Sequence, residues 1–123
     1  MIIWLTGLSG SGKSTVNKIL QQLLIKKSID TIMIDGDVLR ELYGNDLKFN
    51  ENDRKKQIKR IQKLACFFEK SKRIVLVSAL YSNQNILKKN RKIFKKYLEV
   101  YLKAPISVLI FSNIVFIIVF FFI

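Results

Sequence analysis

Eight residues near the start of the chain have the types and spacing needed to bind a nucleoside triphosphate. Residues 7–14 read Gly7-Leu8-Ser9-Gly10-Ser11-Gly12-Lys13-Ser14 and match the pattern G-x-x-x-x-G-K-[ST], with Thr15 next. Glycines let the backbone curl until successive N–H groups face an anion. Lys13 can then reach the β- and γ-phosphates, and the Ser14 hydroxyl can be a ligand of Mg²⁺. Residues 7–15 are therefore the predicted phosphate-binding loop.

The segments on either side of this loop are the elements that must position it. An apolar run at residues 1–6 is long enough for one buried strand. Behind the loop, a helical pattern over residues 14–27 places apolar side chains on one predicted face, at Val16, Ile19, Leu20, Leu23 and Leu24. A strand, a glycine loop and a helix in this order favour a phosphate-binding loop over a chance turn, and the helix N-terminus adds partial positive charge.

Two carboxylates follow the second predicted strand, at residues 31–34. The strand stops at Asp35-Gly36-Asp37, and the carboxyl ends of parallel strands border the crevice where α/β sheets bind ligands. Asp37 is the better candidate to accept a hydrogen bond from an acceptor hydroxyl or to hold the metal through water, and Asp35 is the alternative for either role. The competing interpretation is an ordinary strand-ending turn, in which Asp and Gly are common.

Two arginines stand apart from a basic charge that is mostly lysine. Arg40 lies about one helical turn after Asp37, and Arg54 follows the polar turn at residues 49–53. A guanidinium group binds phosphate or sulfate oxygens in a fork that an ammonium group cannot copy; the alternative is a pair of surface arginines. Phe49 could stack on a base or staple the following helix, and Asn50 and Asp53 are candidates for reciprocal caps of that helix.

The alternation of strands and helices predicts the fold class. Right-handed βαβ crossovers give an α/β fold, a three-layer parallel sheet of the P-loop, nucleotide-kinase-like type. The predicted strands are residues 1–6, 31–34, 73–78 and 98–102, and the predicted helices are residues 14–27, 38–42, one starting near Asn50, and 83–96. The helix after Asn50 has an apolar face with Ile58, Ile61, Leu64, Ala65 and Phe68, and lysines line much of its other face.

Composition limits the remaining function classes. The chain has 123 residues, enough for one domain, and a formal net charge of +13. Such charge suits phosphate-rich ligands, but Lys far outnumbers Arg and no nucleic-acid motif occurs, so a solvated lysine surface is favoured and no specific nucleic-acid partner is predicted. The single cysteine, Cys66, excludes an intrachain disulfide and favours a cytoplasmic setting. No signal peptide precedes the first strand, and the absence of histidine excludes a His-based metal site.

Four segments together resemble the adenylylsulfate kinase family. They are residues 3–15, 35–40, 49–54 and 98–102, and the resemblance runs in order and at family spacing over residues 1–110. It implies ATP-dependent phosphorylation of the 3′-hydroxyl of adenylyl sulfate, giving 3′-phosphoadenylyl sulfate, with Mg²⁺. It also implies that Asp37 serves the acceptor hydroxyl or the metal, and that adenylyl sulfate binds to Arg40, Phe49 and Arg54.

Three departures from the family pattern occur. Gln57 stands where the family usually has Asn in the substrate helix, a change of one methylene. Tyr81, in Ser78-Ala79-Leu80-Tyr81-Ser82, stands where many members have a serine that is sometimes phosphorylated; the roles of Ser78 and Tyr81 stay open. Third, from about Phe111 the chain is an apolar sequence. In the family this part contains an Arg-Asp and Lys-Gly-Leu-Tyr segment, which forms a mobile lid, and then a final strand.

The uncharged residues 106–123 form an apolar tail after a predicted kinase domain at residues 1–105. One interpretation is a membrane anchor with the kinase domain on the cytoplasmic side, because a helix of this length spans about 27 Å. A second is a buried strand or helix that finishes the fold in a new way. The third, which we favour, is an interrupted reading frame, because the resemblance to the family stops and the residues that follow are of few types.

Loss of the lid predicts weak or absent turnover, because water is then poorly excluded from the reaction. Two other functions stay open. One is a non-catalytic nucleotide-binding protein, with or without a membrane anchor. The other is a P-loop kinase for another small acceptor. The sequence does not predict the oligomeric state.

Overall fold

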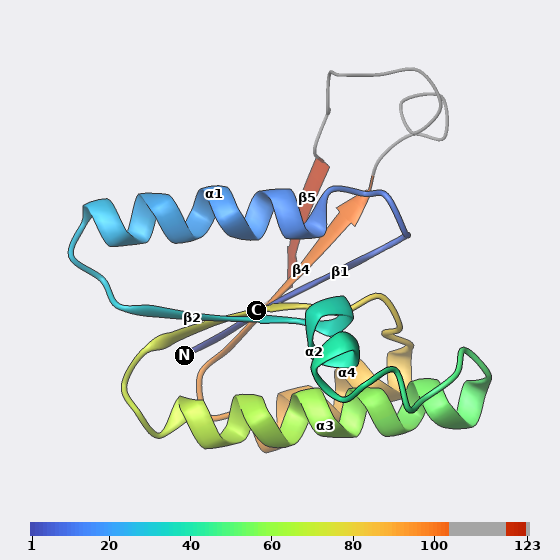
Figure 1. Ribbon diagram of the computed structural model, residues 1–123. Helices are drawn as coiled ribbons and strands as arrows, with labels where there is room; N and C mark the ends of the chain where they lie inside the picture. Colours follow the sequence, from blue (N-terminus) through green and yellow to red (C-terminus); the bar gives the residue numbers. More distant parts are fainter. Residues whose placement is uncertain (104–117, 123) are drawn as a thin grey trace.

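The structure, a computed structural model, describes residues 1–103 and the backbone of residues 118–122. Strands and helices alternate along the chain (Figure 1). In order they are β1 (Ile2–Gly7), α1 (Lys13–Lys26), β2 (Thr31–Asp35), α2 (Gly36–Leu42), α3 (Glu51–Glu69), β3 (Ile74–Ser78), α4 (Gln84–Ile93), β4 (Tyr97–Lys103) and β5 (Ile118–Phe122).

The strands form one sheet in the order β2-β3-β1-β4-β5. β1 pairs in parallel with β3 and β4, and β3 pairs in parallel with β2, so the predicted parallel α/β sheet is confirmed. The carboxyl ends of β1, β2 and β3 consequently lie at the same edge of the sheet. The glycine loop, the Asp35–Asp37 segment and Ser78 all follow or end these strands, and they meet at that edge.

The fifth strand corrects one expectation from the sequence. β5 pairs antiparallel with β4, with Val100 opposite Phe121, whereas the sequence analysis favoured an interrupted reading frame for the tail and kept a strand that finishes the fold only as an alternative. Of the interpretations of the tail, a strand that finishes the sheet agrees with residues 118–122. The other tail predictions, namely the membrane anchor, the break in familial text and the loss of the lid, involve residues 104–117 and lie outside the described residues. Within the described part of the chain, no helix is both long and apolar enough to cross a membrane.

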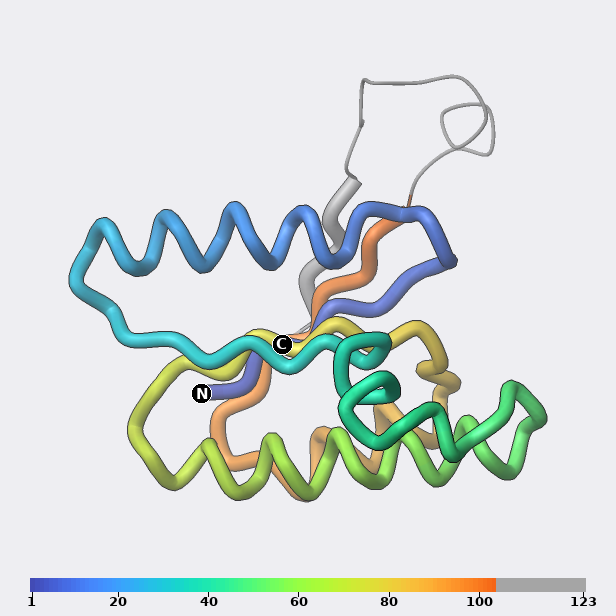
Figure 2. The backbone as a smooth tube through the Cα atoms, viewed as in Figure 1, coloured from blue at the N-terminus to red at the C-terminus, as the bar shows by residue number. Residues whose placement is uncertain are grey.

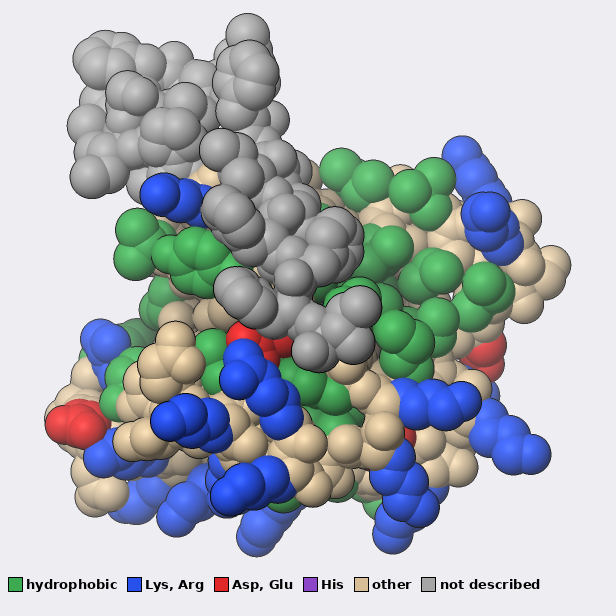
Figure 3. All heavy atoms as spheres, turned by 180° about the vertical axis from the view of Figure 1, so that it is seen from behind, with side chains coloured by type: hydrophobic (Ala, Val, Ile, Leu, Met, Phe, Trp, Pro, Cys, Tyr) green, Lys and Arg blue, Asp and Glu red, His purple; other side chains and the backbone are tan. Residues whose placement is uncertain are grey.

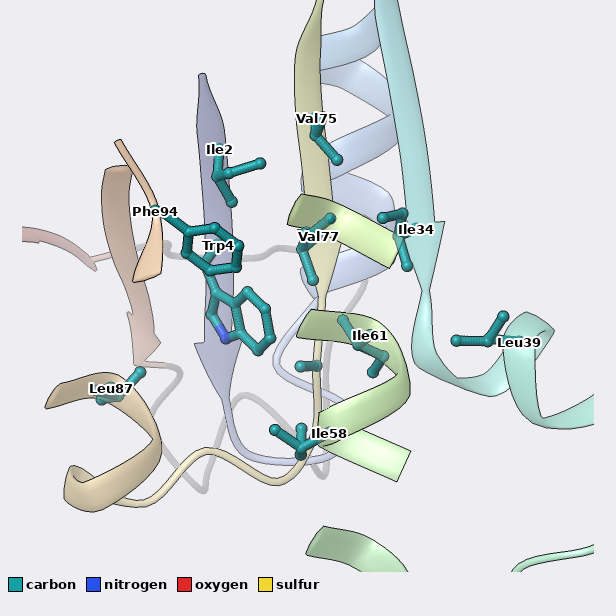
Figure 4. Close-up of a cluster of buried hydrophobic side chains, with 12 residues drawn as sticks. Ile2, Trp4, Ile34, Leu39, Ile58, Ile61, Val75, Val77, Leu87 and Phe94 are labelled. Atoms are coloured by element: carbon teal, nitrogen blue, oxygen red, sulfur yellow. The ribbon is translucent and has the colours of Figure 1, made fainter. Parts of the chain in front are cut away.

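Two layers of helices cover the sheet (Figure 2). Helix α1 lies on one face over a cluster that includes Ile3, Leu5 and Leu76. Helices α3 and α4 cover the other face, where the larger cluster is drawn in Figure 4. Its labelled side chains come from the sheet and from α2, α3 and α4, and they include Ile2, Trp4, Ile34, Val75, Val77, Leu39, Ile58, Ile61, Leu87 and Phe94. Burial of this apolar area is the main force that holds the layers together.

Trp4 lies in the middle of the larger cluster. Its side chain is fully buried, and its ring centroid lies 6.2 Å from that of Phe94. The indole Nε1 donates a hydrogen bond to Ser82 Oγ at 3.1 Å, which satisfies the one polar atom of the ring. The bond attaches β1 to the segment that follows β3.

The buried face of α1 differs from the predicted one. Val16, Leu20 and Leu24 pack against the sheet, but Ile19 and Leu23 are 52% and 51% exposed. The fully buried residue of α1 is instead the polar Asn17. The apolar stripe is wider than the surface that the sheet offers, so its flank remains on the outside.

Helix α4 is shorter than predicted. The sequence pattern extended it to Lys96, but it ends at Ile93, and Phe94 takes an extended conformation that carries its ring into the core. The backbone N–H groups of Lys95 and Lys96 donate to the carboxylate of Glu69, at the end of α3. These bonds come from a residue 26 positions before Lys95, which a local pattern cannot reveal.

The lysines of α3 lie on its outer surface, as predicted. Lys and Arg side chains gather over the layer of α3 and α4 in the lower half of Figure 3. Lys55, Lys56, Lys59 and Lys63 are all exposed. The distribution agrees with a solvated basic face.

Candidate active site

The backbone of the glycine loop requires glycine at two positions for two different reasons. At Gly7, a Cβ atom would lie 2.5 Å from the carbonyl oxygen of Leu102 in β4, so the close approach of the strand excludes any side chain. Gly12 precedes α1 with φ of 86°, in the left-handed region that favours glycine. Gly12 has no side chain to cap α1, and the first turn of α1 contains no acidic residue. The N–H groups at this helix end are consequently free to bind an anion.

Lys13 lies along the loop that it follows. Its Nζ donates to the carbonyl oxygens of Gly7 at 3.0 Å and Leu8 at 2.7 Å. Partial burial lowers the pKa of the Lys13 ammonium, and the carboxylates of Asp37 and Asp35 partly oppose this shift. The ammonium group is therefore partly desolvated and close to both acids, as expected of a cation that receives phosphate oxygens.

The carboxylate of Asp35 joins the loop to α2. Its Oδ2 accepts a hydrogen bond of 2.6 Å from the Ser14 hydroxyl. Its Oδ1 accepts from the backbone N–H groups of Asp37 at 2.9 Å and Val38 at 3.4 Å, which makes Asp35 the N-cap of α2. Both oxygens are thus engaged in holding the site together.

Asp37 differs from Asp35 in its contacts. It lies in the first turn of α2 and lines the same cavity as Lys13. Among the described residues, no hydrogen bond or ion pair engages its carboxylate. The sequence analysis ranked Asp37 before Asp35 without assigning them different roles. The geometry distinguishes them, because both oxygens of Asp35 hold neighbouring segments and the carboxylate of Asp37 is available to a ligand.

The hydroxyl of Ser14 and the carboxylate of Asp35 are oxygen donors of the kind that Mg²⁺ prefers. They lie within hydrogen-bond distance of each other at the cavity wall. In the described part of the chain, no group of three or more Asp, Glu, Cys or His side chains could hold a metal by itself. The residues present therefore fit a magnesium ion bound mainly through phosphate oxygens and water, with one or two protein oxygens.

Arg40 and Arg54 both hold the segment that carries Phe49. The Nη1 atom of Arg40 donates to the carbonyl oxygen of Leu47 at 3.0 Å, and the Arg40 guanidinium lies 4.6 Å from the centroid of the Phe49 ring. The Nε atom of Arg54 donates to the carbonyl oxygen of Phe49 at 2.6 Å, and the Arg54 guanidinium lies over the Tyr81 ring. Phe49 is 63% exposed, so it does not staple α3 to the core. Its ring lines the cavity instead.

The cap of α3 forms differently from the predicted reciprocal pair. The side chain of Asn50 accepts from the backbone N–H of Asp53 at 2.9 Å, as expected of an N-cap. The carboxylate of Asp53, however, accepts from the backbone N–H of Lys48 and from the side-chain amide of Asn50. Asp53 therefore holds the end of the Phe49 segment and does not close a capping box.

Gln57 contributes a buried amide to the wall of the site. The side chain is 4% exposed, and its Nε2 donates to the carbonyl oxygen of Gly36 at 2.9 Å. Its Oε1 is buried without a partner among the described residues. One half of the amide is thus bonded to α2 and the other half is an unfilled acceptor.

One cavity of about 250 Å³ brings most of the predicted residues together. Its lining includes Ser9, Gly10, Gly12, Lys13, Ser14, Thr15, Asp35, Asp37, Arg40, Phe49, Arg54 and Gln57. Three predicted residues do not line it: Gly7, Leu8 and Ser11. Gly7 and Leu8 act through their carbonyl oxygens, which hold Lys13, and Ser11 is buried inside the loop.

The sequence analysis did not assign several wall residues to the cavity. Leu80 lines it, as do Ile58 and Ile61, which were predicted only for an apolar helix face, and Ser78 and Tyr81, whose roles were left open. Ser78 Oγ accepts a hydrogen bond of 2.6 Å from the fully buried Nδ2 of Asn17. The end of the third predicted strand could have indicated Ser78, because it lies at the ligand-binding edge. No local signal indicates Asn17.

A phosphate loop at the carboxyl edge of a parallel sheet, with acidic side chains close to its lysine, defines a P-loop protein of the kinase type. Comparison with known proteins narrows this class. The family model described as Adenylylsulphate kinase matches residues 1–111, and the chain belongs to that family.

Individual relatives agree with the family match. The chain is 40% identical over 110 residues to the adenylyl-sulfate kinase of Prochlorococcus marinus, covering 88% of this chain and 55% of that protein. It is 36% identical over 110 residues to the adenylyl-sulfate kinase of Buchnera aphidicola subsp. Acyrthosiphon pisum, covering 88% and 53%. The chain thus spans about half the length of the curated relatives it matches.

A solved structure has the same arrangement of elements. The APS kinase of Mycobacterium tuberculosis, determined in complex with AMPPNP and APS, superimposes with a TM-score of 0.81 at 31% identity. The match covers 88% of this chain and 65% of that one.

Proposed function

We propose that this chain transfers the γ-phosphoryl group of ATP to the 3′-hydroxyl of adenylyl sulfate, giving 3′-phosphoadenylyl sulfate and ADP. In this transfer the 3′-oxygen forms a bond to the γ-phosphorus while the bond from that phosphorus to the bridging oxygen of ADP breaks. The proton of the hydroxyl passes to the carboxylate of Asp37. Mg²⁺ would neutralise charge on the β- and γ-phosphates when bound.

The observation that carries the proposal is the shared cavity. The glycine loop and Lys13 line it together with Arg40, Phe49 and Arg54. Asp37 is close enough to Lys13 to act on its pKa, and it precedes Arg40 by one helical turn. A triphosphate on the loop and an acceptor on the arginine side would therefore both meet Asp37.

Each residue has a role that follows from its contacts. The free N–H groups of α1 and the Lys13 ammonium bind phosphate oxygens. The oxygens of Ser14 and Asp35 would hold Mg²⁺, Asp35 through water. Asp37, whose carboxylate has no hydrogen bond or ion pair with the residues that the structure describes, accepts the hydrogen bond of the attacking hydroxyl and orients it. The exposed ring of Phe49 offers a face for adenine, and the N–H groups of the two arginines that the backbone leaves unused can bind the phosphate or sulfate.

Family membership supports this substrate over other small acceptors. The relatives named adenylyl-sulfate kinase share 36–40% of their residues with this chain, and the Mycobacterium tuberculosis protein binds AMPPNP and APS. The magnesium ion is part of the proposal because a kinase requires one and because the oxygens of Ser14 and Asp35 fit it.

The test is release of ADP from ATP by the purified chain, with and without adenylyl sulfate. We expect turnover that requires both compounds and that falls by about 100-fold or more in Lys13→Ala, because Lys13 stabilises transferred phosphate charge. Lys18→Ala, an exposed lysine on the same helix, is the matched control and should equal the unmodified chain.

Two results would contradict the proposal. Binding of ATP without Lys13-dependent turnover would favour the non-catalytic nucleotide-binding protein. Equal rates with a sugar acid or a nucleoside monophosphate in place of adenylyl sulfate would favour a kinase for another acceptor.

A further inference from the structure

Gln57 and Asp35 hold the same peptide group from opposite sides. The peptide that links Gly36 to Asp37 has one carbonyl oxygen and one N–H group. Its carbonyl oxygen, that of Gly36, accepts from Gln57 Nε2 at 2.9 Å. Its N–H group, that of Asp37, donates to Asp35 Oδ1 at 2.9 Å. Both polar atoms of this peptide plane are therefore bonded to side chains, one from α3 and one from the end of β2.

The same turn is also packed tightly at its Cα atom. A Cβ added at Gly36 would lie 3.3 Å from the carbonyl oxygen of Ser78 and 3.5 Å from Ile61 Cδ1. Gly36 therefore lies directly against β3 and α3, with little room to rotate. Two hydrogen bonds and this contact fix the direction in which the next side chain, that of Asp37, leaves the backbone.

We propose that Gln57 is a positioning residue for the phosphoryl transfer, which it serves by fixing the Gly36–Asp37 peptide and through it the Asp37 carboxylate. The inference rests on the proposed function, because it assigns Asp37 to the attacking hydroxyl. Gln57 acts through the turn and needs no contact with the reacting atoms.

The chemistry of the amide determines which end does this work. Only the NH₂ end of Gln57 can donate to the Gly36 carbonyl, so the orientation of the amide is settled by that bond. The opposite end, Oε1, has no partner among the described residues. The bond to Gly36 is thus the one described polar contact that holds the amide, and without it only packing joins the Gly36 peptide to α3.

The length of the side chain is part of the argument. The family resemblance places Asn at this position, one methylene shorter. With one methylene fewer, an asparagine amide on the same backbone would lie farther from the Gly36 carbonyl than the 2.9 Å of the glutamine bond. We therefore expect the shorter residue to hold the turn less firmly than glutamine does.

Helix α3 supplies a matched control. Gln62 lies five positions after Gln57, is 5% exposed, and donates from Nε2 to Asn90 Oδ1 at 2.8 Å. It has the same side chain, helix and degree of burial, but its bond faces α4 and does not line the cavity. Gln57→Met and Gln62→Met each remove one buried amide while keeping the length of the side chain.

The experiment compares these variants in two measurements. The first is kcat and KM for adenylyl sulfate with the dissociation constant for ATP. The second is hydrogen exchange of the Asp37 and Val38 amides, which needs no turnover. We expect Gln57→Met to lower kcat by up to about 100-fold, because small displacements of a reacting group cost that much, with ATP affinity unchanged. Exchange at Asp37 should become faster, Gln57→Asn should be intermediate in both measurements, and Gln62→Met should match the unmodified chain.

The outcomes separate the two proposals. If the unmodified chain turns over, the proposed function is upheld. Equal kcat values in Gln57→Met and Gln62→Met would then overturn the positioning role of Gln57. If the unmodified chain shows no turnover, the proposed function fails, and amide exchange alone decides whether Gln57 holds the turn: unchanged exchange at Asp37 in Gln57→Met overturns it. Should Gln57→Met not fold, Gln57→Asn carries both measurements.

Discussion

Ser14 and Asp35 are joined by a hydrogen bond of 2.6 Å between the Ser14 hydroxyl and Oδ2 of Asp35. The two residues come from the start of α1 and the end of β2, so this bond links the phosphate loop to the segment that carries both candidate acids. Asp35 also caps α2, whereas the carboxylate of Asp37 forms no hydrogen bond or ion pair in the described part of the chain. Substitution should therefore affect the two acids differently.

Asp35→Ala should weaken both stability and the response to magnesium. Loss of an N-cap typically costs about 1 kcal/mol in the free energy of unfolding. The Ser14 hydroxyl would also lose its acceptor. Urea titration and ATP binding at a series of Mg²⁺ concentrations measure the two effects. If neither the urea midpoint nor the Mg²⁺ dependence of ATP binding changes, the contacts of Asp35 contribute to neither stability nor magnesium binding.

Asp37→Asn should leave the fold intact and affect the reaction. The carboxylate supports no described contact, so the urea midpoint should stay the same as in the unmodified chain. If Asp37 accepts the hydrogen bond of the attacking hydroxyl, kcat should fall by about 100- to 10,000-fold, the usual contribution of a general base. If kcat stays within a few-fold of that of the unmodified chain, another group accepts the hydrogen bond of the attacking hydroxyl.

Gly7→Ala should destabilise the protein more than Gly12→Ala. A methyl group at Gly7 would lie 2.5 Å from a backbone oxygen of β4, whereas at Gly12 nothing lies within 4 Å and only the positive φ is unfavourable. The left-handed conformation costs a non-glycine residue about 1–2 kcal/mol. Chemical unfolding of the two variants compares them, and an equal loss would mean that β4 moves away from the loop at little cost.

Binding of ATP should weaken with rising pH before an exposed lysine loses its proton. Burial lowers the pKa of Lys13 from the ordinary 10.5. A triphosphate binds the protonated ammonium better than the neutral amine, so affinity falls as pH rises through this lowered pKa. Dissociation constants between neutral and alkaline pH should show this decline in the unmodified chain and no such decline in Lys13→Ala. Parallel profiles would assign the pH dependence to other groups.

The pair of Asp46 and Arg60 should make stability depend on acid pH. Hydrogen bonds from the Arg60 guanidinium hold the pKa of Asp46 below its ordinary value of 3.8. A group with a lowered folded pKa contributes stability above its unfolded pKa, and that stability is lost as pH falls through the folded pKa. Below pH 3.8 the urea midpoint of the unmodified chain should therefore fall more steeply than that of Asp46→Asn. If the urea midpoints of the two proteins fall equally at acid pH, the pair of Asp46 and Arg60 contributes nothing to stability.

The phosphate loop and the parallel strands could be predicted because their signals are local. The loop pattern is contiguous, and the runs at residues 31–34 and 73–78 end within one residue of the observed strands. Because helical crossovers join parallel strands, the carboxyl ends of these strands were expected at one edge of the sheet. The acids at 35 and 37 were consequently predicted at the site without any knowledge of contacts.

Other features depend on partners that are distant in the sequence. Asn17 pairs with Ser78 over 61 positions and Gln57 with Gly36 over 21. Both side chains have mostly polar neighbours one turn away on their helices, so a periodic pattern predicts exposure, whereas both are buried. The same limit explains Ile19 and Leu23: periodicity gives the width of an apolar stripe but not the area of sheet available to cover it. The difference between Asp35, whose carboxylate accepts from Ser14, and Asp37, whose carboxylate does not, likewise depends on the position of Ser14 in space.

The bond between Trp4 and Ser82 gives the protein an internal optical reporter. Trp4 is the chain's single tryptophan, so all tryptophan fluorescence comes from one indole, buried in β1 three residues before the glycine loop begins at Gly7. Its Nε1 is bonded to the segment that follows β3, directly after Tyr81 at the cavity wall. Emission from this ring senses both the packing of the core and the position of that segment, so ligand binding and unfolding can be followed without a label.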